Sequence, residues 1–284
     1  LLNSIVKYYD IHNLRTSLGY IRFGLFSLGV FYFINQNKKI LNWVFYVFVF
    51  CFISLTLDGF IQFVFKENLF NIKVDLSGRI SSLFGSEYVM GSYLSRLFPI
   101  FLATTFYLFK EKKRYILLIS ILFIMIEILI FLSGERAAFF FNTFAAIFVI
   151  IMIRDFKKIR LMSLIVSFIL ITLITIVDNS AKKRIWDSTI DQIGFRTEKI
   201  NIFSEVHESH YRSAYKMYLE NKVIGIGVRN FRNFCHETKF QDSHKRSCTT
   251  HPHNTYVQIL AELGLVGFIF FAGLFFVFLY FCIK

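Results

Sequence analysis

The sequence predicts an all-α protein, a polytopic bundle of transmembrane helices with one large external loop region. The composition is the first observation: 55% of the 284 residues are hydrophobic and the mean hydropathy is +0.54, more than a single soluble core requires. The second is that apolar residues gather in segments close to the roughly 20 residues that a helix needs to cross a bilayer. The third is the near absence of proline, with two in the chain. A helix is favoured because it satisfies its own backbone hydrogen bonds in lipid.

Seven segments come close to the length of a membrane span. In chain order they are residues 16–34, 40–57, 88–109, 115–132, 137–153, 161–177 and 257–282. Short basic loops follow the first, third and fifth. They carry Lys38 and Lys39, then four basic residues in 110–114, then four in 154–160.

These three loops are each separated by two spans, so they must share one face of the membrane. Lys and Arg are retained on the cytoplasmic side, and we assign that face to the cytoplasm. The opposite face then receives the segment from Asp58 to Glu87, the tight turn from Ser133 to Arg136, and the long polar stretch 178–254.

This topology divides the chain into three regions. Residues 1–177 form transmembrane helices with short loops, 178–254 form the large external loop, and 255–284 form the C-terminal transmembrane helix. The topology also places the residues before the first span outside. Since the sequence opens on Leu1 without a signal peptide, we interpret the chain as a fragment lacking at least one N-terminal helix, and absent C-terminal helices remain an alternative.

The net charge of +13 does not indicate nucleic-acid binding, because much of the excess lies in the cytoplasmic loops. The external loop carries 13 Lys and Arg against 9 Asp and Glu, and six of the seven histidines. A weakly cationic external surface suits an anionic substrate, although a solvated surface of mixed charge explains the count nearly as well.

Charged residues lie within predicted spans, among them Arg22, Arg96 and Glu127. Arg96 and Glu127 lie at similar depth on consecutive spans, at about 1.5 Å of rise per residue. A lone charge at that depth is expensive. The sequence therefore predicts a structural ion pair between Arg96 and Glu127.

Two cysteines of the external loop, Cys235 and Cys248, are candidates for a disulfide, which an oxidising compartment would permit. The alternative is a zinc site made by both cysteines with His236 and His244, but this spacing matches no compact zinc pattern. Two free thiols are the third possibility. We rank the disulfide first and expect no metal.

The stretch "HPHNTYVQILAELGLVG" begins the last predicted helix. Asn254 is a favourable N-cap, and Thr255 with Gln258 fits a capping box, so we expect the helix to start within a residue of Asn254. His253 then lies at a helix N-terminus, where free N–H groups bind phosphate. The positive end of the helix dipole also keeps an imidazole neutral, so it can accept a proton. A merely capping role for His251 and His253 is the alternative.

A polar stripe continues along this helix. Asn254, Gln258 and Glu262 follow at four-residue spacing and should face protein or water, while Gly264 and Gly267 offer a small face for helix packing. The stretch "VIGIGVRNF" lacks the spacing of a dinucleotide site, and we interpret it as a turn.

A pattern at the start of the last predicted helix resembles the signature of the O-antigen ligase and O-antigen polymerase superfamily. It consists of His253-Asn254, nine further residues, and then Gly264-x-x-Gly267. Three other stretches resemble that family's pattern in the expected order. "GRISSLFGSEYVMGSYLSRLFP" supplies Arg79, "LSGERAAFF" supplies Arg136, and "HYRSAYKMYLENKVIGIGVRNF" supplies Arg212. The chain departs from the pattern where Ser86-Glu87-Tyr88 replaces an Asn-Pro-Asn-like triplet, and where a proline is absent before the Gly-x-Gly turn.

The resemblance implies a GT-C-like arrangement in the bacterial inner membrane, with the external loop and the active site facing the periplasm. The donor would be a glycan on undecaprenyl pyrophosphate, and the acceptor a saccharide hydroxyl on lipid A core or on another lipid-linked repeat unit. Membrane lipid would surround the spans, and no cofactor is expected.

The resemblance and the residues together assign a role to each candidate residue of the site. His253 would act as base, and Arg136 and Arg212 would stabilise the pyrophosphate through charge-assisted contacts. Arg79, His251 and Asn254 would bind substrate. Each arginine has a structural alternative, such as a pair of Arg136 with Glu135 or of Arg212 with Glu208 on a surface helix.

Two rival classes remain at this stage. A transporter or flippase for a polysaccharide precursor would also carry charges and a polar stripe in its spans, although no inverted repeat is visible. A non-enzymatic envelope protein whose loop binds a partner is the second. The sequence does not decide whether the protein is a ligase or a polymerase.

Overall fold

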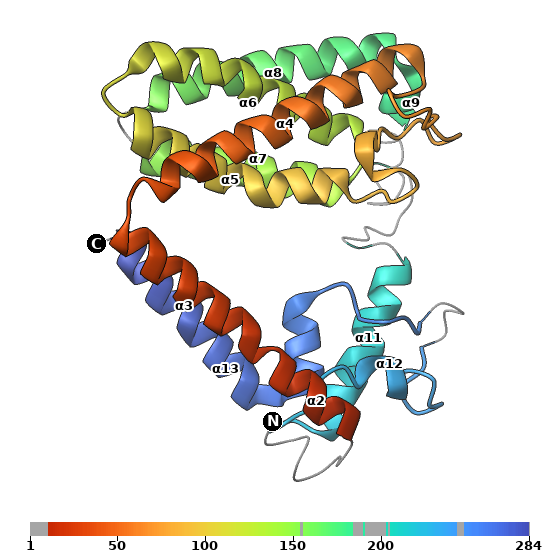
Figure 1. Ribbon diagram of the computed structural model, residues 1–284. Coiled ribbons are helices and arrows are strands. Elements are labelled where there is room, and N and C mark those ends of the chain that lie inside the picture. Colours follow the sequence, from red (N-terminus) through yellow and green to blue (C-terminus); the bar gives the residue numbers. More distant parts are fainter. Residues whose placement is uncertain are drawn as a thin grey trace. The chain divides into compact units, whose positions relative to one another are not determined.

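The computed structural model describes residues 11–153, 156–183, 190, 203, 205–242 and 247–283 (Figure 1). In these residues the chain is built from helices joined by turns, and the only extended pairing among them is an isolated bridge between Glu67 and Lys73. The predicted all-α class is confirmed, and the protein is a polytopic helical membrane protein.

The chain divides into two compact units, Tyr32–Ile190 and Leu1–Phe31 with Asp191–Lys284. The helices of the first unit are α4 (Ile40–Phe65), η1 (Ser82–Phe84), α5 (Met90–Phe109), α6 (Lys113–Leu132), α7 (Arg136–Met152), α8 (Lys157–Val177) and α9 (Asn179–Lys182). Those of the second include α2 (Ile11–Gly19), α11 (Glu205–Glu220), α12 (Phe231–Phe234) and α13 (Thr255–Ile283), and α3 (Ile21–Gln36) also begins there.

All seven predicted spans lie largely in helices, with a turn at Tyr20 in the first and with residues 88–89 of the third preceding its helix. Among the described residues, five helices are long and apolar enough to cross a membrane: Arg15–Gln36, Ile40–Phe65, Lys113–Leu132, Lys157–Val177 and Thr255–Phe281. The other two predicted spans correspond to α5, which has 20 residues, and to α7, which is apolar but has 17 residues.

The second predicted span was drawn too short at residue 57, because α4 continues to Phe65. Asp58 is therefore not the start of a loop but a buried helical residue. Its carboxylate accepts hydrogen bonds from Asn68 Nδ2 at 3.0 Å, Ser82 Oγ at 2.7 Å and the Leu69 backbone N–H at 3.2 Å. A charge at the end of this helix thus anchors the chain that follows it.

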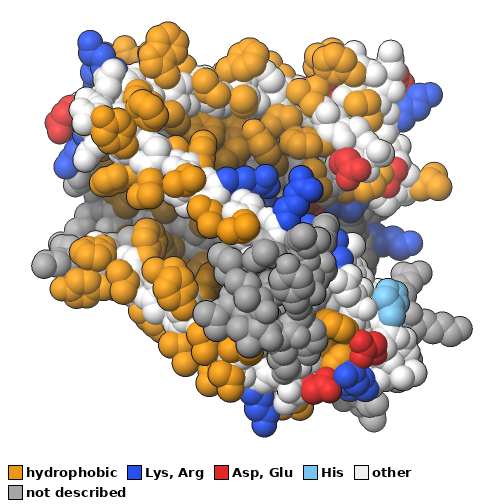
Figure 2. All heavy atoms as spheres, turned by 60° about the horizontal axis from the view of Figure 1, so that its bottom comes forward, with side chains coloured by type: hydrophobic (Ala, Val, Ile, Leu, Met, Phe, Trp, Pro, Cys, Tyr) orange, Lys and Arg blue, Asp and Glu red, His pale blue; other side chains and the backbone are white. Residues whose placement is uncertain are grey.

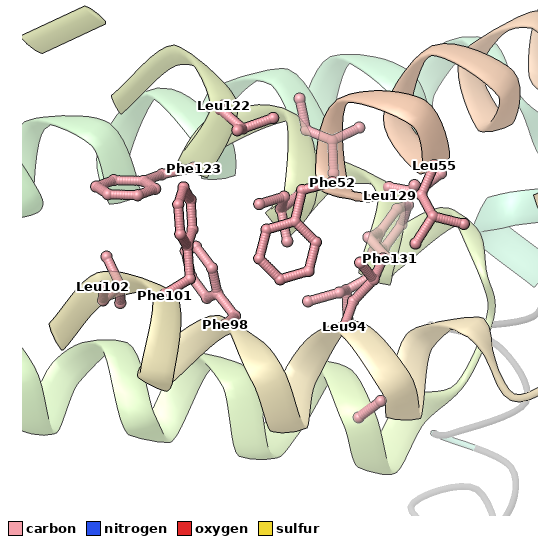
Figure 3. Packing of buried hydrophobic residues seen from close by; sticks show 14 of the residues in the cluster. Phe52, Leu55, Leu94, Phe98, Phe101, Leu102, Leu122, Phe123, Leu129 and Phe131 are labelled. Atoms are coloured by element: carbon pink, nitrogen blue, oxygen red, sulfur yellow. The ribbon is translucent and has the colours of Figure 1, made fainter. Parts of the chain in front are cut away.

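Phenylalanine side chains pack with leucine and isoleucine side chains in the core of the first unit (Figure 3). Phe52 of α4 meets Phe101 of α5 edge to face, with ring centroids 5.1 Å apart, and Phe101 meets Phe123 of α6 at 5.6 Å in the same way. Edge-to-face geometry is a favoured arrangement of aromatic pairs. Helix α6 is the most enclosed of the five candidate spans, so it forms the centre of this unit.

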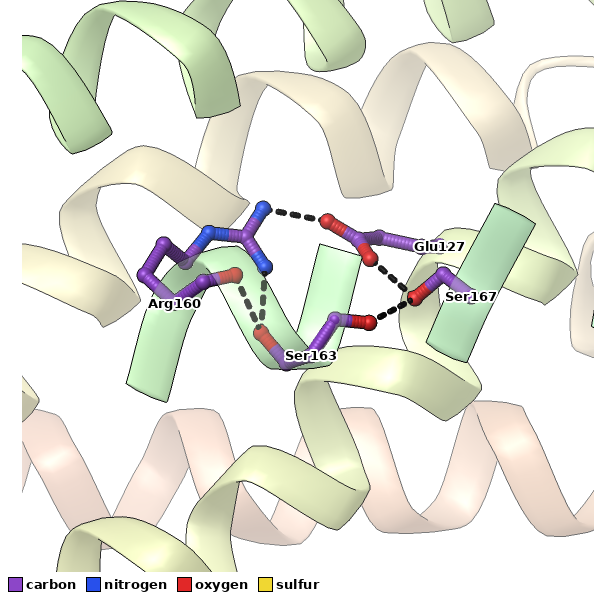
Figure 4. Close-up of polar contacts among 4 residues, drawn as sticks. All are labelled: Glu127, Arg160, Ser163 and Ser167. Atoms are coloured by element: carbon purple, nitrogen blue, oxygen red, sulfur yellow. Dashed lines mark hydrogen bonds and ion pairs between the residues drawn. The ribbon is translucent and has the colours of Figure 1, made fainter. Parts of the chain in front are cut away.

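The predicted pair between Arg96 and Glu127 is wrong. Glu127 is buried and pairs with the guanidinium of Arg160, which is buried as well (Figure 4). Ser167 Oγ also donates to Glu127, and Arg160 donates to Ser163 Oγ at 3.1 Å. Arg96 is exposed instead. Depth alone could not identify the partner, because Arg160 looks like one more basic loop residue, whereas the structure places it in the first turns of α8.

Hydrophobic side chains also cover much of the outer face seen in Figure 2. Aromatic and aliphatic residues of α4 and α8, such as Trp43, Phe50 and Ile176, are largely exposed. Apolar exposure of this extent exceeds that of soluble monomers, and it is the surface expected against lipid.

Candidate functional site

Helix α13 begins at Thr255, within a residue of Asn254 as predicted. The Asn254 side-chain oxygen accepts hydrogen bonds from the backbone N–H groups of Tyr256 at 3.0 Å and Val257 at 3.2 Å. Asn254 alone is therefore the cap, and the Thr255 and Gln258 side chains form no capping box among the described hydrogen bonds, where Gln258 Nε2 instead donates to Glu262 at 3.3 Å. His253, directly before the cap, has a left-handed backbone with φ of 56°.

This cap changes one expectation. Two of the N–H groups that the sequence assigned to an anion are already occupied by Asn254, so the helix start offers less to a phosphate than an uncapped helix would. The arrangement favours a structural role for the Asn254 side chain. Any charge stabilisation of a substrate must come chiefly from side chains.

Four histidines meet at this point. We call His207 and His210 of α11, together with His251 and His253, the histidine cluster. The ring centroid of His253 lies 4.2 Å from that of His251 and 5.6 Å from those of both His207 and His210. Although much of its surface is exposed, its pKa is lowered from the ordinary value, first by partial burial and then by the charges of the other three. This shift favours the neutral imidazole, the form that can accept a proton.

The two glycine motifs of the sequence come together further along α13. Gly264 interrupts α13 with a φ of 65° and ψ of −163°, so a first helical segment ends there and the long apolar segment follows. The turn at Gly225 packs against this break: an added Cβ on Gly264 would lie 2.5 Å from the Val223 backbone, and one on Gly225 would lie 2.4 Å from that of Glu262.

Backbone groups freed at the break find partners in the same turn. The N–H groups of Ile226 and Gly227 donate to the carbonyls of Ala261 and Glu262 at 2.9 and 2.8 Å. On the other side of the break, the N–H of Leu265 donates to the Lys222 carbonyl at 2.8 Å. The expectation that Gly264 serves helix packing is therefore wrong, because it serves a break whose backbone groups the 222–227 turn satisfies.

The polar stripe of α13 faces protein, as predicted. Glu262 is buried and accepts hydrogen bonds from Gln258 at 3.3 Å and from the Phe231 backbone N–H at 3.4 Å. It belongs to the segment before the break. The stripe therefore ties the first part of α13 to α12.

Arg212 lies on α11, on the surface of the same unit. Its guanidinium is 2.6 Å from Glu208 and 4.0 Å from Asp242, with its side chain 57% exposed. The hydrogen bond and charge of Glu208, then the charge of Asp242, raise its pKa. The pair with Glu208 is the structural alternative that the sequence left open, and exposed pairs of this kind hold a side chain only weakly.

Cys235 and Cys248 form a disulfide, with Cα atoms 5.1 Å apart. Cys235 is fully buried beside Ala214, Met217 and Phe231, in the small core that supports α11 and α13. His236 lies next to the bridge, and His244 lies outside the described residues. A disulfide leaves neither sulfur as a thiolate ligand for zinc.

Arg79 and Arg136 belong to the other unit, where both adjoin the turn after α6. Arg79 Nε donates to the Ser133 carbonyl at 2.9 Å, and its guanidinium lies 4.5 Å from the ring centroid of Tyr88. These contacts give Arg79 a structural function in fixing the turn. Arg136 is the first residue of α7 and is half-buried.

Glu135, the neighbour of Arg136, caps another helix. Its carboxylate accepts hydrogen bonds from the backbone N–H groups of Gly91 at 2.7 Å and Ser92 at 3.1 Å, and from the Ser92 hydroxyl. A carboxylate at this position also offsets the positive end of the α5 dipole. The turn from Ser133 to Arg136 is thereby fixed to the start of α5.

Sequence reasoning missed His207 and His210. The signal was available, because six of seven histidines lie in the external loop and these two are three residues apart, on one face of a helix. The sequence alone could not show which helix α11 packs against.

Comparison with models of known protein families gives a match. A family model described as O-antigen ligase matches residues 118–272, just over half of the chain. Arg136, Arg212, His251, His253 and Asn254 all lie within the matched residues, and Arg79 lies before them. No curated protein and no solved structure matches.

Proposed function

The chain belongs to the O-antigen ligase family, and on that premise we propose that it transfers a glycan from undecaprenyl pyrophosphate to a saccharide hydroxyl. The family supports glycan transfer of the O-antigen ligase or polymerase type in general. The donor, the mechanism and the residues that follow are our proposal. The observation that carries it is the placement of His253, which lies directly before a capped helix with its ring centroid 4.2 to 5.6 Å from those of three other histidines, and whose pKa is lowered by partial burial and then by those histidines.

In the proposed reaction, His253 accepts the proton of the acceptor hydroxyl. The hydroxyl oxygen then forms a bond to the anomeric carbon of the donor glycan, while the bond from that carbon to the pyrophosphate oxygen breaks. Undecaprenyl pyrophosphate leaves with the electron pair, and the proton passes from His253 to solvent. Direct displacement inverts the configuration at the anomeric carbon.

The leaving pyrophosphate develops charge that permanently charged arginines can stabilise. Arg136 and Arg212 are the proposed residues for this function, and the scheme requires no metal. Arg212 is exposed and held only by surface pairs, so exchanging Glu208 for a phosphate costs little. Arg79 and Asn254 are proposed to fix the backbone around them, each within its own unit, since their contacts are already structural, and His251 is proposed to bind substrate beside His253.

We propose that the protein resides in the bacterial inner membrane with the cluster on the periplasmic side. The short basic loops 110–114 and 154–160 support this orientation.

Complementation with the full-length gene tests the proposal. In hosts lacking their own ligase or polymerase, the wild type should restore lipopolysaccharide bands on a gel: capped core for a ligase, extended chains for a polymerase. His253→Ala should lose this restoration at normal protein level. An unchanged ladder with His253→Ala would reduce His253 to a residue of the helix start and favour the transporter alternative.

A further inference from the structure

A groove of about 300 Å³ lies between α11 and the first turns of α13. Three tyrosines of α11 line it, Tyr211, Tyr215 and Tyr218, together with Val257 and Leu260 of α13. Both helices belong to one unit. The groove is therefore built entirely by the segment that holds the histidine cluster.

The tyrosines share one face of α11 because they are spaced by four and three residues. The ring centroids of Tyr215 and Tyr218 lie 6.0 Å apart, and Tyr215 is 55% exposed. Each ring offers an apolar face and a hydroxyl that can donate or accept a hydrogen bond. Such a row matches the two kinds of surface of a sugar, its C–H faces and its hydroxyl edges.

Charged groups complete the lining. Arg212 and Glu208 both contribute to the groove and bond to each other at 2.6 Å. Guanidinium donors and carboxylate acceptors can each bond to sugar hydroxyls. A purely apolar occupant, such as a polyprenyl chain, would leave this pair without new partners, so the charges favour a saccharide.

The groove lies close to the histidine cluster of the proposed active site. The ring centroid of Tyr211 lies 6.4 Å from that of His207, which lies 5.6 Å from that of His253. Arg212, our proposed pyrophosphate ligand, stands between Tyr211 and Tyr215 in the sequence of this helix. Arg212 precedes Tyr215 by three residues, roughly 4.5 Å of rise along α11, so a saccharide bonded to a pyrophosphate at Arg212 would begin beside these rings.

We propose that the tyrosine groove binds the saccharide of the donor, adjacent to its pyrophosphate. This inference rests on the proposed function. The groove lies at the small end of ligand pockets, so it accommodates the first sugars of the glycan rather than a whole chain. Tyr215 and Tyr218 would then determine which donor glycans are accepted.

Kinetics with the full-length protein in proteoliposomes test this. Tyr215→Ala and Tyr218→Ala should raise KM for the donor on the order of tenfold, the equivalent of about 1.4 kcal/mol, while KM for the acceptor and kcat change little. Tyr218→Phe, which keeps the ring and loses only the hydroxyl, should raise KM for the donor less than Tyr218→Ala does. Leu219→Ala is the matched control, since Leu219 is an exposed neighbour on α11 outside the groove lining.

The probe for direct binding is the free oligosaccharide of the host's repeat unit, released from the donor by mild acid and lacking pyrophosphate. Saturation-transfer NMR should show its sugar protons receiving saturation from the wild-type protein, and a strongly reduced transfer in Tyr215→Ala. This measurement needs no turnover. It separates failure of the groove from failure of the proposed function, which His253→Ala tests.

Unchanged donor KM in both alanine variants, or a rise confined to the acceptor KM, would overturn the proposal. The second result would assign the groove to the acceptor. Absence of saturation transfer from the wild-type protein would overturn it as well. Unfolding temperatures equal to wild type exclude misfolding as the cause of any change.

Discussion

At the scale of single residues, the proposed reaction depends on the ionisation of His253. Its lowered pKa arises from partial burial and from His251, His207 and His210. Folding therefore favours the neutral imidazole, and stability from this group is retained above about pH 6.5, the ordinary pKa of histidine, and declines as the pH falls below it. The base should stay competent in mildly acidic surroundings.

This gives a pH prediction. The acid limb of kcat/KM should lie below pH 6.5 for the wild type, because that limb reports the pKa of the free enzyme's base. Replacing His207 and His210 by Gln removes two neighbouring charges, so the limb should move to higher pH. His236→Gln, outside the cluster, is the control. A limb that stays in place in the double variant would contradict the electrostatic role of the cluster.

The sequence predicted part of this site. Local patterns sufficed for the helix start at Thr255 and the cap at Asn254, because capping is decided by a few adjacent residues. They did not suffice for the free N–H groups, since the cap itself occupies two of them. They also could not supply His207 and His210, which reach His253 only through packing of α11 on α13.

At the scale of elements, the broken helix α13 is the least replaceable feature. Gly264→Ala and Gly225→Ala should each lower the unfolding temperature markedly and reduce the protein level, because a Cβ would meet backbone at 2.5 and 2.4 Å. Both positions also have positive φ, which strains any L side chain. Gly273→Ala, with open space at its Cβ, should be tolerated. Equal stability of all three variants would contradict a helix break that requires glycine at positions 225 and 264.

The buried ion pair between α6 and α8 allows a double-mutant cycle. Glu127→Ala should cost about 3–5 kcal/mol of stability, since it leaves the Arg160 charge buried without compensation. Adding Arg160→Met should recover part of that loss, because the unpaired charge is then gone. Arg96→Ala, at an exposed position, should show no coupling to Glu127. A coupling energy between Glu127 and Arg96, and none between Glu127 and Arg160, would support instead the pairing inferred from depth.

Hydropathy predicted the helices but not their ends. Helix α4 continues past residue 57 because the polar residues Asp58 and Gln62 are bonded to the chain that follows. Polar residues bonded in this way within a helix look like the start of a loop in a hydropathy profile. The broken α13 was missed for the related reason that its break is satisfied by residues 222–227, far away in the sequence.

At the scale of the whole molecule, the orientation and the disulfide make a joint prediction. Cys235 and Cys248 should be resistant to alkylation until reduced when the protein is made in a host with an oxidising periplasm, and free when that oxidising system is absent. Removing the bridge should cost about 3 kcal/mol on the chain-entropy model. A reporter fused at residues 110–114 should be cytoplasmic. A periplasmic reporter there would contradict the orientation.

Glycan transfer by purified protein in proteoliposomes is the most direct test of the central claim that His253 is the base of the reaction. The assay supplies an undecaprenyl-pyrophosphate glycan and the acceptor that complementation identifies, and it compares wild type, His253→Gln and His236→Gln. We predict that His253→Gln lowers kcat by at least about a hundredfold, which is the lower end of the contribution that a general base makes to the rate. His236→Gln should stay near wild type. Undiminished kcat in His253→Gln would contradict the mechanism.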